Sequence, residues 1–187
     1  MDIKIIKVKA DKLFPDSPEM YKIKKIYFCV LNYIHKNDWT GACHASSSVM
    51  YLLLREQGID AKLYIGEVKR DDIIFDHSWL EINDQIFDAA ISNTQIKNIQ
   101  FPAVFSNIEL STGNSTLSDY SFKSGQGLES EMEFFSSNTL GYYLDNFPNH
   151  PKGLWGIASI LSKQMGMKFN IAKAKNMYSN ENWLQKS

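Results

Sequence analysis

The chain has 187 residues, of which 44% are hydrophobic and 22% are charged, and this is enough for one domain with a substantial core. Its 20 basic and 21 acidic residues give a formal net charge of -1, so there is no excess of positive charge of the kind that binds nucleic acid or a membrane surface. The N-terminal segment lacks the apolar run of a signal peptide, and no segment has about 18 uninterrupted apolar residues, so we expect a cytoplasmic protein that does not span a membrane.

The two cysteines, Cys29 and Cys43, are too few to indicate a disulfide framework. The sequence contains neither a C-x-x-C nor an H-E-x-x-H motif, which are common spacings of metal ligands. We therefore expect neither a metal nor a cofactor. The composition does not indicate an oligomeric state.

Two helices are predicted in the first third of the chain. The first begins with Ser17 as N-cap and Pro18 at the first helical position, followed by apolar residues spaced three and four apart. It contains Cys29 between apolar neighbours, which we interpret as a buried structural thiol. The second helix runs from about residue 42 to residue 57 and ends before a glycine, so that Cys43 lies in its first turn.

Three short runs of strand character follow, at residues 61–68, 77–83 and 85–91. Asn83 and Asp84 favour a turn and predict an antiparallel hairpin between the last two runs. Up to this point the elements are therefore two helices followed by a meander of strands.

Beyond residue 91 the periodicity is weaker. Residues 111–131 are rich in serine and glycine and predict a long loop or irregular insert that could form a mobile flap. Two further helices are predicted, within residues 136–147 and from Pro151 to Gly166, and residues 176–187 are expected to fray. The aromatic residues of this half are expected to form core, with a peptide-binding groove as the alternative; they are Phe101, Phe105, Tyr120, Phe122, Phe134, Phe135, Tyr142 and Tyr143.

Cys43, His77 and Asp88 are the residues that indicate an enzyme. A thiol is a good nucleophile only as a thiolate, and the positive end of a helix and a neighbouring imidazolium both lower its pKa. Histidine can accept that proton and return it to a leaving amine, because its pKa lies near neutrality. An aspartate on the other ring nitrogen fixes the tautomer and orientation of the imidazole. Cys43 alone would be interpreted as a structural thiol, whereas the three residues together favour catalysis.

The predicted hairpin provides a geometric check on this interpretation. With Asn83 and Asp84 at the turn, Trp79 pairs with Asp88, and His77 lies two positions further along the same face. His77 and Asp88 are then diagonal neighbours, about 7–8 Å apart between backbone positions, which their side chains can bridge. A turn shifted by one residue would change the face.

The stretch GACHASSSVMYLLLREQGIDAKLYIGEV, followed by DHSWLEINDQIFDAAI, resembles the core of the transglutaminase-like superfamily, relatives of papain-type cysteine proteases. The shared pattern is a cysteine that opens a helix, a helix end that leads into the first strand, a His-x-Trp-x-Glu strand, and an aspartate in the next strand. In this sequence these positions are Cys43, Leu53, Leu54, Arg55, Gly58, Ile59, Ala61, Gly66, His77, Trp79, Glu81 and Asp88. Many members have a Pro-Thr or similar pair after the aspartate, whereas here two alanines follow.

The resemblance implies an α+β, papain-like fold in which the nucleophile helix packs on an antiparallel β-sheet, with extra C-terminal helices. We expect a single domain over residues 1–187, with a core motif at about 40–91 and a family-specific extension at 92–187.

The resemblance also implies acyl transfer from an amide of a peptide or protein substrate through a thioester. Cys43 would be the nucleophile, His77 the general acid and base, and Asp88 the residue that orients it. A peptidase or amidase is the main expectation. A transglutaminase or N-acyltransferase that transfers the acyl group to an amine is one alternative, and a non-catalytic binding protein with the same fold is another.

For the oxyanion, backbone N–H groups at the helix start can serve, including that of Cys43. A side-chain donor upstream is a common addition in this superfamily, and Trp39 and Asn37 are the nearest candidates, with packing or loop capping as their alternative roles.

Three further residues are interpreted with less functional weight. Trp79 is either a wall of the substrate cleft or part of the core. His44 projects about 100° around the helix from Cys43, so we expect it to face solvent or cap the helix rather than act as a second base. Glu81 is expected to pair with a surface lysine.

Overall fold

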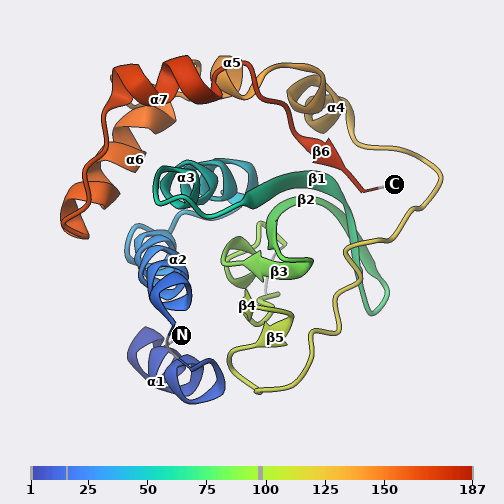
Figure 1. Ribbon diagram of the computed structural model, residues 1–187. Helices are drawn as coiled ribbons and strands as arrows, with labels where there is room; N and C mark the ends of the chain where they lie inside the picture. Colours follow the sequence, from blue (N-terminus) through green and yellow to red (C-terminus); the bar gives the residue numbers. More distant parts are fainter. Residues whose placement is uncertain (1, 16, 97–98, 187) are drawn as a thin grey trace.

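The computed structural model describes residues 2–15, 17–96 and 99–186, and in this part of the chain the fold is α+β, with seven α-helices and a mixed six-stranded sheet (Figure 1). The helices are α1 (Ile3–Leu13), α2 (Pro18–Lys36), α3 (Cys43–Glu56), α4 (Ser130–Ser137), α5 (Leu140–Asp145), α6 (Gly153–Gln164) and α7 (Ile171–Tyr178). The strands are β1 (Ala61–Arg70), β2 (Ile73–Ile82), β3 (Gln85–Asp88), β4 (Val104–Phe105), β5 (Ile108–Glu109) and β6 (Leu184–Gln185). None of the described helices combines the length and apolarity needed to cross a membrane.

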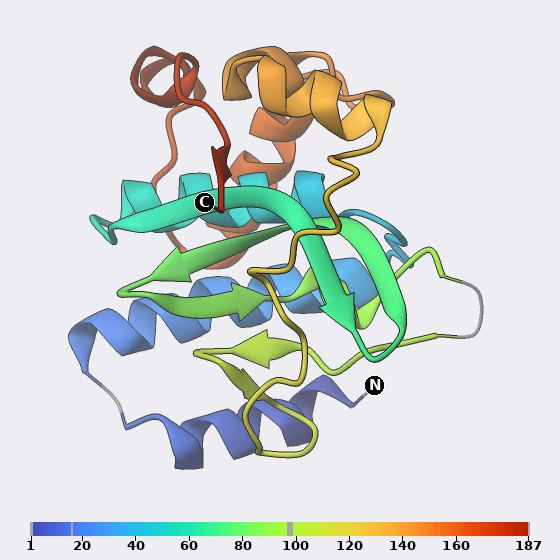
Figure 2. The ribbon, with the colours of Figure 1, turned by 90° about the vertical axis from the view of Figure 1, so that its right-hand side faces the viewer.

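The sheet has the strand order β5-β4-β3-β2-β1-β6. Strands β1 to β5 pair in sequence as antiparallel neighbours, whereas β6 returns from the C-terminal end and pairs with β1 in parallel, with Leu184 opposite Tyr64 (Figure 2). The expectation of a purely antiparallel sheet is therefore wrong at this edge, because a two-residue edge strand carries no local signal for the direction in which it pairs.

Helix α3 lies between α2 and α6 and packs on one face of the sheet (Figure 1). It is buried on every side, because each residue from His44 to Leu54 is shielded from solvent. Leu80 of β2 belongs to the same core, whereas the adjacent Trp79 belongs to a second, smaller cluster on the other face of the sheet, together with Tyr120. Alternate residues of β2 therefore serve two different cores.

The hairpin predicted at Asn83 and Asp84 is confirmed. Both residues have positive φ, 51° and 59°, which a two-residue turn of this kind requires. Ile82 pairs with Gln85, and this is the register expected from the sequence. Strand β3 ends at Asp88 rather than at residue 91, because the chain turns there into a single 3₁₀ turn (Ala90–Ser92).

The predicted helices α2, α3 and α6 are present within a few residues of their expected ends, and Ser17 accepts the backbone N–H of Met20 at 3.0 Å as the N-cap of α2. Helix α1 was not predicted. Asp2 caps its N-terminus, and its buried side chains, Ile6 and Ala10, lie four residues apart on one face. The alternation of isoleucine and lysine in this segment obscured that spacing.

The C-terminal half is more ordered than expected. Residues 110–129 contain no helix and no extended strand, in agreement with the prediction of an irregular segment. The final segment does not fray: the hydroxyl of Tyr51 donates to the carboxylate of Glu181, and Trp183 is buried.

Candidate active site

Cys43 is the first residue of α3 and is half-buried at the end of the helix. The chain reaches it through Gly41, which has a φ of +66° and donates its backbone N–H to the carbonyl of Asn93 at 3.1 Å. A Cβ at Gly41 would lie 2.3 Å from the side chain of Gln95, so only glycine fits between the two loops. The cysteine is thus fixed relative to the segment that follows β3.

His77 of β2 and Asp88 of β3 are joined by a hydrogen bond of 2.7 Å between Nε2 and Oδ2. Both side chains are buried, with 3% and 0% of their surface exposed. Asp88 is held further by the hydroxyl of Tyr120, which donates to Oδ2 at 2.8 Å, and by the N–H of Ile91, which donates to Oδ1 at 3.1 Å. The hairpin register brings the pair together on one face, as the diagonal expected from the sequence requires.

Cys43 and His77 line the same cleft, and the charge of each acts on the pKa of the other. Because Nε2 is taken by Asp88, Nδ1 is the nitrogen left for the sulfur. The three predicted residues therefore lie together, with His77 hydrogen-bonded to Asp88 and electrostatically coupled to Cys43.

The electrostatics of this chain favour an ion pair. Burial raises the pKa of Cys43, but the charges of His44 and His77 lower it by more, to well below the ordinary value. Burial lowers the pKa of His77, but Asp88 and the Cys43 thiolate raise it to about 10. At neutral pH the pair is therefore a thiolate and an imidazolium. Burial raises the pKa of Cys29, so this cysteine remains a thiol at neutral pH.

His44 is not exposed to solvent, and the expectation that it faces water or caps the helix is wrong. Only 6% of its surface is exposed, because α3 turns this residue towards β2. Its Nδ1 lies 2.5 Å from Oγ of Ser78, and its charge lowers the pKa of the Cys43 thiol. The sequence signal for the close approach of α3 to β2 is the run of small residues after His44. One of them, Ser47, donates its hydroxyl to the carbonyl of Ser78 at 2.9 Å.

A cleft of about 620 Å³ opens over Cys43, His44 and His77. Its far wall is built by α4, α5 and the residues after them, which contribute mainly aromatic side chains: Phe134, Phe135, Tyr142, Tyr143 and Phe147. The cleft is also lined by Asp76, Glu129 and Glu131, and among the residues that the structure describes no lysine or arginine lines it. Part of the aromatic set thus lines a groove, whereas Phe101, Phe105 and Tyr120 are core.

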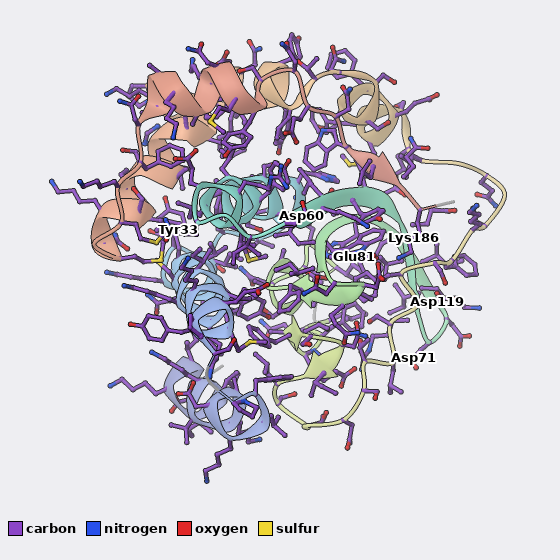
Figure 3. All side chains as sticks on the ribbon, viewed as in Figure 1. Tyr33, Asp60, Asp71, Glu81, Asp119 and Lys186 are labelled. Carbon is purple, nitrogen blue, oxygen red and sulfur yellow. The ribbon has the colours of Figure 1, made fainter. Side chains whose placement is uncertain are left out.

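The structure does not bring Asn37, Trp39 or Trp79 to the cleft lining. The side-chain amide of Asn37 donates to the carbonyl of Tyr33 at 2.7 Å and so caps α2 (Figure 3 labels Tyr33). Trp39 packs edge-to-face against Tyr33 and Phe147. Both residues therefore take the packing and capping roles that were the alternatives to an oxyanion role.

Trp79 is fully buried and its indole N–H donates to Glu81 at 3.1 Å, which places it in the core rather than in the cleft. Glu81 forms an ion pair with Lys186, as expected from the sequence, and Figure 3 shows the two side chains near β6. This pair ties the C-terminal segment to β2.

Asn93 lines the cleft and was missed by the sequence analysis. Its side chain is 7% exposed, and within the described part of the chain its amide nitrogen has no hydrogen-bond partner. A buried N–H without a partner lowers the stability of the folded state. The unpaired amide of Asn93 is therefore suited to bind an acceptor atom of a ligand. The sequence signal for it is only an asparagine in the turn after the strand that bears Asp88.

Among the residues that the structure describes, no group of three or more His, Cys, Asp or Glu side chains could hold a metal ion.

Comparison with protein families gives a match over residues 15–99, just under half of the chain, to the model described as transglutaminase-like superfamily. The matched segment begins before α2 and ends after Asn93, so it contains Cys43, His77 and Asp88. No curated protein and no solved structure matches the chain. The resemblance seen in the sequence is confirmed, because residues 15–99 match the model of the transglutaminase-like superfamily.

Proposed function

We propose that this protein is a cysteine-dependent acyl-transfer enzyme that acts on an amide bond through a thioester. The observation that carries the proposal is the hydrogen-bonded pair of His77 and Asp88 at a cleft that Cys43 and His77 line together. The superfamily supports a cysteine-dependent enzyme in general. In this proposal Cys43 is the nucleophile, His77 the general acid and base, and Asp88 the residue that orients His77.

The first half-reaction is acylation. The Cys43 thiolate attacks the carbonyl carbon of the amide, and a C–S bond forms while the carbonyl π electrons move to oxygen. When the tetrahedral intermediate collapses, the C–N bond breaks and the His77 imidazolium gives its proton to the departing nitrogen. The products are a free amine, a neutral His77 and an acyl group on the sulfur.

The second half-reaction regenerates the thiolate. Neutral His77 takes a proton from water, the oxygen attacks the thioester carbon, and the C–S bond breaks to release a carboxylic acid. If a primary amine attacks instead, the product is a new amide, and the same residues serve. The peptidase or amidase reaction is the main proposal, and transfer to an amine is its alternative.

The oxyanion of both intermediates needs donors near the sulfur. The backbone N–H groups at the start of α3 are suited to this role, because Ala42, the N-cap residue, provides no side-chain cap for them. Asn93 adds a side-chain amide without a partner on the same cleft, a role for which Trp39 and Asn37 are not placed.

The cleft favours a peptide or protein substrate. Its aromatic wall can take apolar side chains, and its polar floor contains the reacting groups. This supports a segment of polypeptide as the substrate, with one of its side chains against α4 and α5 and its amide over Cys43.

The test is a peptide library incubated with the wild type and with Cys43→Ala, His77→Ala and Cys29→Ala, followed by mass spectrometry. We expect cleaved or deamidated peptides with the wild type and Cys29→Ala only, and an acyl adduct on Cys43. Addition of a primary amine separates hydrolysis from transfer, because only transfer yields the new amide. Products that persist in Cys43→Ala would contradict the proposal. A folded wild type that binds a peptide without turnover would support the non-catalytic binding protein instead.

A further inference from the structure

The imidazoles of His44 and His77 line the cleft together with Cys43, and the charge of each lowers the pKa of the Cys43 thiol. The proton-transfer scheme above uses only His77. His44 comes directly after the nucleophile, lines the same cleft and has no part in that scheme.

The ring of His44 is held on several sides. Oγ of Ser78 lies 2.5 Å from its Nδ1, and the rings of Phe135 and Trp183 pack edge-to-face against it with centroids 5.9 and 5.8 Å away. Three elements that are distant in the sequence, namely β2, α4 and the C-terminal segment, therefore fix one imidazole beside the sulfur.

The two imidazoles differ in what holds them. His77 is held by the carboxylate of Asp88, which stabilises its protonated form and suits it to carry a proton. His44 is held by the hydroxyl of Ser78, which can either donate or accept. Because Nδ1 faces Ser78, Nε2 is the ring nitrogen of His44 that is left for another partner.

The charged and titratable groups near His44 come from several elements. Cys43 on α3 and Asp76 on β2 interact with its charge directly. His77 on β2 shares the sulfur with it, and Tyr143 on α5 lies near that sulfur. The packing partners from α4 and the C-terminal segment, Phe135 and Trp183, bear no charge.

We propose that His44 is a second catalytic imidazole, which stabilises the thiolate of Cys43 while His77 moves the proton. The proposal rests on the proposed function, since it assigns a role at the same sulfur. It predicts that thiolate stabilisation survives in part when His77 is removed, because the two imidazoles act on the sulfur separately.

The experiment measures the rate of Cys43 alkylation by iodoacetamide against pH, by mass spectrometry, with Cys29 in the same protein as the internal reference. The variants are His44→Phe with Ser78→Ala, His77→Gln, and all three changes together. Phenylalanine keeps the aromatic packing, and Ser78→Ala avoids leaving a buried hydroxyl without a partner. We expect the midpoint to rise by about one pH unit or more in the first variant, and to reach the ordinary thiol value, about 8.5, only in the triple variant.

Ser78→Ala alone, with Ser47→Ala as its matched control, covers the case in which the double change unfolds the protein. Ser47 also bonds to residue 78, but through the carbonyl, so Ser47→Ala disturbs the contact between α3 and β2 without releasing His44. We expect a smaller rise in midpoint for Ser78→Ala and none for Ser47→Ala. Equal midpoints with and without His44, in both the wild-type and the His77→Gln background, would overturn the proposal. A wild-type Cys43 that titrates like Cys29 would instead contradict the proposed function itself.

Discussion

The two walls of the cleft are built in different ways. The wall formed by α3, β2 and the turn after β3 is buried and hydrogen-bonded. For example, the carboxylate of Asp88 accepts three hydrogen bonds, from His77, Tyr120 and Ile91. The wall formed by α4 and α5 is only partly covered: no residue of α4 is buried, and Phe134 is 50% exposed. Rigid placement is needed where bonds are made and broken, whereas a loosely packed wall can adapt to what is bound. We infer that chemistry resides in the first wall and selectivity in the second.

The largest expected effect comes from the nucleophile. Cys43→Ala should reduce turnover by about 10⁴-fold or more, because the residues of a nucleophile–base unit act together. The change removes a half-buried side chain, so the variant should fold and bind peptide with an affinity like that of the wild type. Turnover and peptide binding measured on the same preparation check both halves of this expectation. Loss of peptide binding together with turnover would contradict the inference that chemistry and selectivity reside in different walls.

The next effect concerns Asp88. Asp88→Asn should reduce turnover by about 10²- to 10⁴-fold, because an amide can present its N–H to His77 and impose the wrong tautomer. It should also lower the pKa of His77 from about 10, since the carboxylate raises that pKa. Tyr120→Phe is the matched control: it removes one donor to the same carboxylate but leaves the charge, so its effect should be much smaller. Steady-state kinetics of the two variants provide the measurement.

The pH profile of the wild type follows from the same groups. Activity needs the thiolate and the imidazolium together, so it should rise as Cys43 ionises, well below the ordinary thiol pKa, and fall as His77 loses its proton near pH 10. The plateau should therefore cover the neutral range. A rate that rises only above about pH 8.5, where an ordinary thiol ionises, would contradict the ion pair.

The smallest effects are expected in the second wall. Phe134→Ala should raise KM several-fold for peptides with an apolar side chain at the cleft, while leaving the rate of Cys43 alkylation by iodoacetamide unchanged. Leu117→Ala is the matched control, because Leu117 is an exposed apolar residue that does not line the cleft. If Phe134→Ala slowed alkylation as much as it raised KM, the second wall would be shown to support the thiolate as well.

The first wall could be predicted from the sequence because its geometry is local. Two turn residues, Asn83 and Asp84, set the hairpin register, and that register places His77 diagonally across from Asp88. Gly58 after α3 and the apolar spacing before it defined the helix that Cys43 opens.

The rest depends on contacts between distant segments. Nothing in the sequence near Cys43 indicates that Phe135 and Trp183 pack on His44. Because His44 lies about 100° around the helix from Cys43, its side chain was therefore predicted to face solvent. The parallel pairing of β6 and the unpaired amide of Asn93 likewise arise only when the chain is folded.

The late position of Trp183 in the chain has a consequence for biosynthesis. During translation Cys43, His77 and Asp88 leave the ribosome well before Trp183, the residue that closes the packing around His44. A nascent chain therefore carries its thiol without the complete surroundings that activate it. Strand β6 docks beside β1 (Figure 1), so a fusion partner attached directly after β6 would lie close to this edge of the sheet. An N-terminal tag is therefore the better choice for any assay of this thiol.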